Sequence, residues 1–355
     1  MPLPHLQPLT RMADGTIKQV NPLTGTQVWT VPGRAHRPLA TSDRTPEALD
    51  TAREGRHCAL CPERYLETPP EKARLVRGGD QGWETARHVP AETLFDQVAE
   101  FRRIPNLFEI LSFRYWQANY GFRLHGEAAA HRRSYLGSPA GREHVLAIAR
   151  TRLAAAGVSD EDWAAMSEAE RLEPADAFFG GGHELVVARR HFTDGATHDD
   201  ELASSGSLTP QEHARYMAFT VDAMRSIYAG NPHARYVAVF QNWLKPAGAS
   251  FDHLHKQLLA IDELGVQNEL ELGRLRENPN LYNDAALNYA AREGLLLAEN
   301  EHAVAFAGFG HRYPTLEVFS KSARSMPCYL ESAEQRGMSD LLHACHSATG
   351  SQVPC

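Results

Sequence analysis

The segment Arg235–Ile261 constrains the fold of this chain more than any other stretch. Its beginning, RYVAVF, is aromatic and β-branched and follows an Asn-Pro turn, so it predicts a β-strand. Its end, Gln257–Ile261, is apolar and predicts a second strand. Small residues in Pro246–Ser250 separate the two, and a backbone with short side chains and free N–H groups can approach a phosphate closely. We therefore expect a strand–loop–strand unit beside a ligand site.

Three polar side chains recur at every second position after this loop, namely His253, His255 and Gln257. Alternate side chains of an extended strand leave the same face, so two imidazoles and an amide should point the same way. Such a face can bind a metal, attack a phosphorus or hydrogen-bond an oxyanion. In a chain with 18 histidines, a lone His-x-His pair is more often a solvent-exposed pair without a function. A functional site is favoured here because three polar or small residues precede the pair, namely Asn242, Gly248 and Ser250.

Cys58 and Cys61 form a Cys-x-x-Cys turn. Two thiolates from one tight turn can bind half of a tetrahedral zinc site. A redox pair is the alternative, but no thioredoxin-like strand–helix pattern surrounds the turn, so zinc is favoured. Two more ligands must come from elsewhere, and the neighbouring His57 leaves their assignment open.

Two further places in the sequence could meet a phosphorylated ligand. Arg34 and Arg37 stand three positions apart, and a guanidinium can donate two hydrogen bonds to the oxygens of one phosphate. On local grounds alone, solvated surface arginines are the more ordinary interpretation. Asn106 follows a proline at the edge of an apolar segment.

A strand and a helix are predicted ahead of the central segment. His183–Ala188 alternates as a strand, and His191 stands just past its end. Thr209, Pro210 and Glu212 make a capping box with proline at the first helical position, which predicts a helix running to about Tyr228.

Composition excludes several classes of function. The chain is 43% hydrophobic and 23% charged, which suits a globular core. Its net charge of −8 disfavours broad nucleic-acid or anionic-membrane binding, because both require a basic excess. No stretch has the length of a signal peptide core or a membrane span. Five cysteines with one close pair indicate a reducing cytoplasm rather than a disulfide framework.

Taken together, these motifs resemble the galactose-1-phosphate uridylyltransferase family of the histidine-triad superfamily. The similarity runs from about Val20 to Lys321. It rests on NPLTG…W…R..RP near the N-terminus, Cys-x-x-Cys, Pro105–Phe108, HELVVARRH ending at His191, and FQN…GAS..H.H.Q. Leu254 stands where the family usually has proline.

The resemblance implies an α+β fold, histidine-triad-like, with a mostly antiparallel half-barrel sheet and packed helices. It implies an N-terminal module at residues 15–262 with a helical insertion at about 109–178. A partial second module at 263–355 would follow, shorter than in the family.

The resemblance also implies the roles of the site residues. Zinc would be bound by Cys58, Cys61, His191 and His253. His255 would be the nucleophile that forms a nucleotidyl-histidine. Gln257 and Ser250 would hydrogen-bond the phosphate oxygens during the reaction. The remaining residues would bind substrate: Arg34, Arg37, Asn106, Asn242 and Gly248.

The expected function is a cytoplasmic nucleotidyltransferase acting between a nucleotide sugar, such as a UDP-hexose, and a sugar phosphate. The resemblance also suggests a homodimer. One alternative is a phosphorylase or hydrolase of nucleotide sugars or dinucleoside polyphosphates. Another is a non-catalytic, zinc-stabilised nucleotide-binding protein, and a third is a structural zinc protein whose site is vestigial.

Overall fold

The computed structural model describes residues 7–33, 45–79, 82–353 and 355, and the chain forms two compact units. The larger unit contains the described residues within 44–263 together with 350–355. The smaller unit contains the described N-terminal residues up to 33 and residues 264–349. The expected division into a full module at 15–262 and a partial module at 263–355 stays a prediction.

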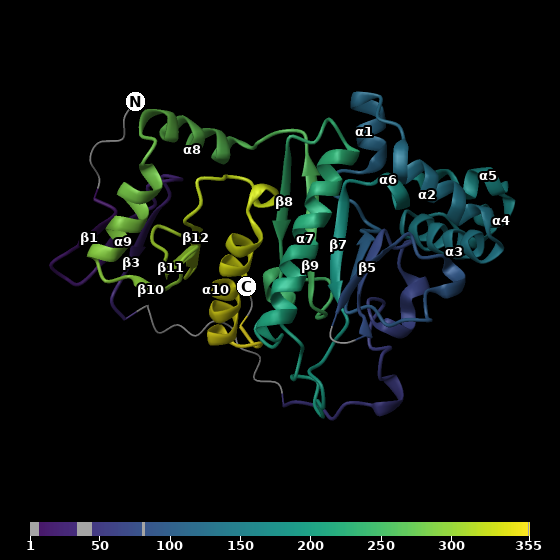
Figure 1. Ribbon diagram of the computed structural model, residues 1–355, viewed down its shortest axis with the longest axis horizontal. Coiled ribbons are helices and arrows are strands. Elements are labelled where there is room, and N and C mark those ends of the chain that lie inside the picture. The colour runs from purple at the N-terminus through teal and green to yellow at the C-terminus, as the bar shows by residue number, and fades with distance from the viewer. Residues whose placement is uncertain (1–6, 34–44, 80–81, 354) are drawn as a thin grey trace. The chain divides into compact units, whose positions relative to one another are not determined.

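A six-stranded sheet forms the centre of the larger unit, in the order β5-β4-β6-β7-β9-β8 (Figure 1). Every neighbouring pair in it is antiparallel. β9 begins at His255 rather than at Gln257, because His255 already pairs with Val187 of β7. The strands are β4 (Ala73–Arg77), β5 (Trp83–Arg87), β6 (Phe101–Pro105), β7 (His183–Ala188), β8 (Tyr236–Phe240) and β9 (His255–Ile261).

Helix α7 (Pro210–Gly230) covers one face of this sheet and contributes to the unit's main hydrophobic core (Figure 1). It begins as predicted, since the Thr209 hydroxyl accepts from the Glu212 N–H and the Glu212 carboxylate accepts from the Thr209 N–H. Tyr216 and Phe219 pack with Val186 and Leu258, which alternate along β7 and β9 onto that face. The opposite face is therefore available for the polar side chains of the motif.

Six helices connect β6 to β7, and serine hydroxyls cap four of them. Apolar residues of α3 and α6, including Ile148 and Phe178, join the core that α7 covers. The helices are α1 (Phe113–Tyr120), α2 (Gly126–Gly137), α3 (Pro139–Ala155), α4 (Asp160–Ala165), α5 (Glu168–Arg171) and α6 (Asp176–Gly180).

The smaller unit has two three-stranded antiparallel sheets, β1-β2-β3 and β10-β11-β12. A turn at Asn21 and Pro22 joins them, because the Asn21 amide donates to the Phe309 carbonyl while its oxygen accepts from the Leu23 and Thr24 N–H groups. The strands are β1 (Leu9–Arg11), β2 (Ile17–Val20), β3 (Gln27–Thr30), β10 (Leu296–Glu299), β11 (Ala303–Ala307) and β12 (Leu316–Ser320). The α-helices are α8 (Val266–Glu277), α9 (Asn288–Arg292) and α10 (Ser332–Thr349).

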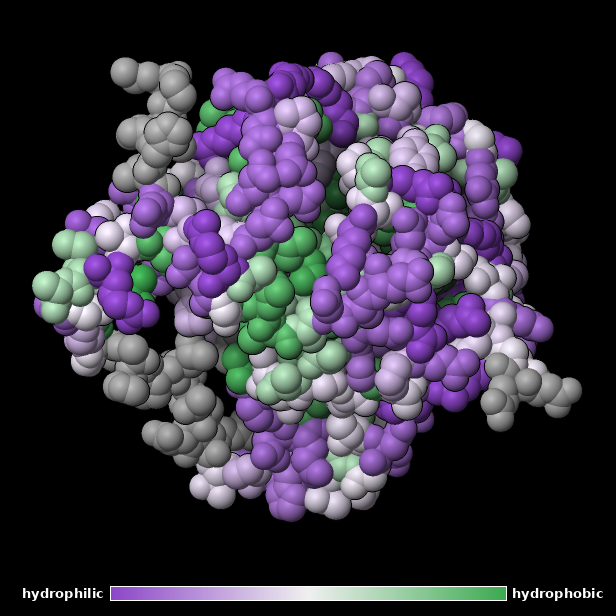
Figure 2. All heavy atoms as spheres, turned by 60° about the vertical axis from the view of Figure 1, so that its left-hand side comes forward, coloured by the Kyte–Doolittle hydropathy of each residue, from purple (hydrophilic) through white to green (hydrophobic). Residues whose placement is uncertain are grey.

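This architecture confirms the predicted α+β class with mostly antiparallel sheets. Across the described part of the chain, no helix combines the length and apolar character that a membrane span requires. Hydrophilic side chains cover most of the face drawn in Figure 2.

Candidate functional site

Four potential metal ligands from three separate segments converge in the larger unit. Cys58 and Cys61 come from the turn before a short 3₁₀ helix, His191 follows β7, and His253 precedes β9. Their ligand atoms all lie within 4.8 Å of one another. The Sγ atoms are 3.8 Å apart, and His253 Nδ1 lies 3.4 Å from Cys58 Sγ and 3.7 Å from Cys61 Sγ. His191 Nδ1 lies 3.5 Å from Cys61 Sγ.

These distances fit a tetrahedral zinc ion. With Zn–S near 2.3 Å and Zn–N near 2.0–2.1 Å, tetrahedral geometry places two sulfurs about 3.8 Å apart and a sulfur and a nitrogen about 3.5 Å apart. The sulfur–sulfur separation agrees with this, and the sulfur–nitrogen separations lie within ~0.2 Å of it. The two thiols and two imidazoles are thus arranged to hold one metal ion.

The protonation states of the ligands also suit a metal. His253 Nε2 lies 2.7 Å from the Ala188 carbonyl oxygen, which can only accept, so the proton is on Nε2 and Nδ1 presents a lone pair to the sulfurs. A hydrogen bond between the two sulfurs lowers the pKa of Cys61 and raises the pKa of Cys58. One thiolate is therefore favoured even before a metal displaces the second proton.

His255 is held in a single tautomer on the first residue of β9. Its Nδ1 lies 2.7 Å from the His253 carbonyl oxygen and must donate to it, which leaves the lone pair on Nε2. The side chain is only 4% exposed, and burial lowers its pKa, so the ring is neutral. A neutral imidazole with one fixed donor and one free lone pair is the state that a nucleophile requires.

The metal-ligand cluster and His255 lie on the same side of the sheet. Cys58 and Leu60 pack against Ile104, Leu185 and Val187, which form a small apolar cluster. Val187 pairs directly with His255, so their side chains share a face, and this face is opposite to the one under α7.

A chain of hydrogen bonds fixes the Gln257 amide on this face. His183 Nδ1 accepts from the Ile110 N–H at 3.2 Å, so the proton is on Nε2, which donates to Gln257 Oε1 at 3.0 Å. The Gln257 NH₂ group is thereby directed away from His183 as a donor. Asn106 lies beside this group, with its Nδ2 3.2 Å from His183 Nε2, but both of these atoms carry hydrogens in this tautomer, so they do not bond to each other. The Asn106 Oδ1 accepts from the Phe108 N–H.

The loop between β8 and β9 is compact. It contains a 3₁₀ helix (Lys245–Ala247) that is capped by Gly248 at φ +92°, a conformation that favours glycine. A Cβ on Gly248 would lie 3.7 Å from the Asn242 amide nitrogen, so these two residues are close. Ser250 is exposed at the end of the loop.

The predicted site residues are thus distributed as follows. The structure brings together all four expected metal ligands and places His255 and Gln257 on the neighbouring strand. Arg34 and Arg37 lie outside the described residues. Sequence reasoning missed His183, which is buried and bonded to Gln257. The alternation of the strand indicates which face of the sheet His183 lies on. It does not indicate that His183 bonds to Gln257, because that contact depends on how β7 pairs with β9.

An antiparallel sheet with a Cys₂His₂ cluster beside a fixed histidine defines a candidate zinc-stabilised group-transfer site. The structure is similar to an ADP-glucose phosphorylase from Arabidopsis thaliana with bound ADP-glucose, at a TM-score of 0.54 and 18% identity. That similarity covers 92% of this chain and 74% of that one. It is also similar to a galt-like protein from Arabidopsis thaliana, at a TM-score of 0.51, 17% identity and the same two coverages. The expected resemblance to the galactose-1-phosphate uridylyltransferase family is confirmed as a likeness of fold.

The chain belongs to the family described as "Domain of unknown function (DUF4921)", which matches residues 12–355. No curated protein matches its sequence.

Proposed function

We propose that this protein is a nucleotidyltransferase that acts on nucleotide sugars by double displacement, with His255 as the nucleophile. The observation that carries the proposal is the His255 ring, whose Nδ1 donates at 2.7 Å to the His253 carbonyl and whose Nε2 lone pair is left free. The likeness of fold to an ADP-glucose phosphorylase supports nucleotide sugars as the substrate class.

In the first half-reaction, His255 Nε2 attacks the α-phosphorus of the nucleotide sugar. An N–P bond forms, the bond from that phosphorus to the bridging oxygen breaks, and a sugar 1-phosphate leaves with the bonding electron pair. In the second half-reaction, a phosphate oxygen of the acceptor attacks the same phosphorus and His255 leaves as a neutral imidazole. No proton transfer to the leaving group is required, because the departing phosphate is already a stable anion.

Gln257 stabilises the charge that develops on the non-bridging oxygens. Its NH₂ group is free to donate because its oxygen is engaged by His183. His183 acts through Gln257 and is a positioning residue. The loop residues Gly248 and Ser250, with Asn106 and Asn242, bind the nucleotide and its phosphates in this proposal.

The Cys₂His₂ cluster has a structural role. Zinc, when bound by Cys58, Cys61, His191 and His253, supplies charge neutralisation for the thiolates and a fixed anchor for the start of β9. The His253 carbonyl that orients His255 belongs to one of these ligands. Loss of the cluster would therefore loosen the tautomer control of the nucleophile.

The acceptor distinguishes a transferase from a phosphorylase. A sugar 1-phosphate as acceptor gives hexose exchange, whereas inorganic phosphate gives a nucleoside diphosphate. The phosphorylase is the second candidate because the ADP-glucose phosphorylase fold aligns with 92% of this chain. Turnover measured with each acceptor separately decides between them.

Isotope exchange tests the proposal. Labelled glucose 1-phosphate is incubated with UDP-glucose or ADP-glucose and the protein, and label entering the nucleotide sugar is followed. Exchange with wild type and with His198→Ala, a histidine half-exposed at the surface of the same unit, together with none for His255→Ala, is the expected result. Exchange that persists in His255→Ala contradicts the mechanism.

A further inference from the structure

The face of the sheet opposite to His255 contains a cavity of about 290 Å³. Arg103 of β6 and Glu184 of β7 line it, and both alternate away from the side that carries His255. The loop at residues 180–182, helix α2 and the end of α7 complete its wall. Its volume is at the lower end of the range for small-molecule sites, which begins at about 300 Å³.

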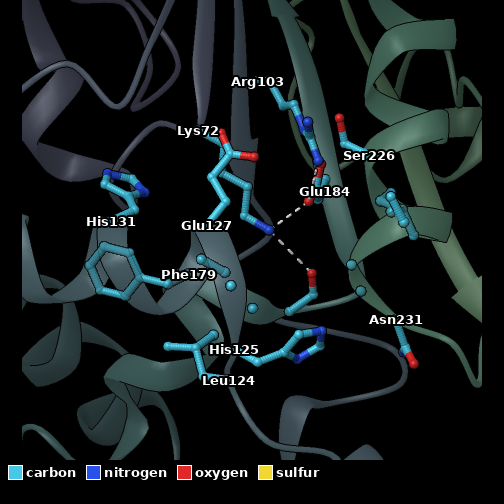
Figure 3. A pocket seen from close by; sticks show the side chains of 18 of the residues that line it. Lys72, Arg103, Leu124, His125, Glu127, His131, Phe179, Glu184, Ser226 and Asn231 are labelled. Atoms are coloured by element: carbon cyan, nitrogen blue, oxygen red, sulfur yellow. Dashed lines mark hydrogen bonds and ion pairs between the residues drawn. The ribbon is translucent and has the colours of Figure 1, made fainter.

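Two buried cations share one carboxylate in this cavity (Figure 3). Lys72 Nζ donates to Glu184 Oε1 at 2.6 Å and to the Gly181 carbonyl at 3.3 Å. Arg103 binds both Glu184 oxygens through Nε and Nη2. All three side chains are about nine-tenths buried or more. Lys72, Arg103 and Glu184 therefore carry one positive charge in excess.

The other charged groups around the cavity either pair with one another or stand at its solvent-exposed rim. Arg87 pairs with Asp222 at 2.6 Å. Glu109, on the far side of Gly181, pairs with Arg152. Glu127 stands at the rim with its side chain 72% exposed and faces His88 at 3.6 Å. Burial lowers the pKa of Lys72 although Glu184 opposes this shift, because one carboxylate is shared between two buried cations. An anion in the cavity would therefore offset a cost that Glu184 only partly removes.

The rest of the wall suits the body of a small organic molecule. Phe122, Leu124 and Phe179 present apolar surface to the cavity. His131 stacks on His88, with ring centroids 4.1 Å apart, and its buried Nε2 has no hydrogen-bond partner among the described residues. A buried ring nitrogen without a partner is unusual and is expected to bond to an occupant of the cavity.

We propose that this cavity is a second ligand site, separate from the nucleotide face, which binds a small organic anion. The anionic head lies at Lys72 and Arg103, and the carbon body lies against Phe122, Leu124 and Phe179. A phosphate monoester and a carboxylate present the same chemistry to this site. Glycerol 3-phosphate and glycerate, which are matched in carbon skeleton, are the two probes that separate them.

Calorimetric titration of the full-length protein with each probe at low ionic strength tests the site. Binding of at least one probe is expected, and the ratio of the two dissociation constants names the head group. Lys72→Met removes the excess charge but leaves Glu184 paired with Arg103, so it should weaken binding at least tenfold. Lys321→Met, the same change at a lysine on the smaller unit, should leave the dissociation constant unchanged. Failure of both probes, or equal binding by Lys72→Met, overturns the proposal.

A wild-type crystal soaked in the tighter probe provides a test that needs no variant. Ligand density in the cavity beside Lys72 and Arg103 supports the site, and density only beside His255 overturns it. Neither experiment depends on nucleotidyl transfer, so the result is independent of the function proposed for His255.

Discussion

Metal removal is predicted to destabilise the larger unit strongly. The Cys₂His₂ separations match one tetrahedral zinc ion, and the ligands join the turn at Cys58 to segments more than a hundred residues away at His191 and His253. A ligand that binds only the folded state stabilises it by about 4 kcal/mol at a thousandfold excess over its dissociation constant. In a unit of this size class, each kcal/mol shifts Tm by about 2–4 °C. Chelation should therefore lower Tm by about 8–16 °C.

The assay is thermal unfolding with and without a chelator, together with zinc quantified by mass spectrometry. One zinc per chain is expected, and Cys61→Ser should lose both the metal and the response to chelator. Cys345→Ser, a change at a partly buried cysteine of the smaller unit, serves as the matched control and should retain both. Zinc-free protein with an unchanged Tm would refute the reasoning from ligand geometry.

Three further predictions concern capping, buried charge and catalysis. Thr209→Ala removes one half of the capping box of α7 and should cost about 1 kcal/mol, read as a small fall in the urea midpoint with an unchanged slope. Glu184→Gln leaves Lys72 and Arg103 without their counter-charge and should cost about 3–5 kcal/mol at neutral pH in the same assay. Burial alone would raise the pKa of Glu184, but Arg103 and Lys72 outweigh it and hold this pKa below its usual value. The stability that this carboxylate contributes is therefore present above the usual carboxyl pKa and is lost as the pH falls through the lowered pKa. The difference in unfolding free energy between wild type and Glu184→Gln should therefore become smaller in acid. A difference that stays constant with pH would contradict this. Gln257→Leu should lower kcat by about 10²–10³-fold with little change in KM, whereas a rise in KM with unchanged kcat would assign Gln257 to ground-state binding.

Local signals in the sequence were sufficient for the elements that local chemistry determines. The strand His183–Ala188 alternates and is preceded by three glycines, and it appears with the predicted bounds. The helix after Thr209 begins at the predicted cap because a Thr, a Pro and a Glu at those spacings satisfy the first free N–H groups whatever the tertiary context.

Long-range contacts were beyond such reasoning. The resemblance to a known family suggested that His191 and His253 join the cysteines, whereas spacing alone left the partners of Cys58 and Cys61 open. His183 and Gln257 are linked only through the register of β7 on β9, which no local pattern specifies. The cavity at Lys72 and Glu184 likewise depends on packing between distant segments.

The central claim is that His255 becomes covalently nucleotidylated, and a mass measurement tests it most directly. Zinc-loaded protein is incubated with UDP-glucose or ADP-glucose without an acceptor, digested under alkaline conditions that preserve phosphohistidine, and analysed by mass spectrometry. The account predicts a nucleoside monophosphate adduct on the peptide that contains His255, absent from His255→Ala, and the mass identifies the base. A zinc-loaded protein that binds either donor but forms no adduct would contradict it.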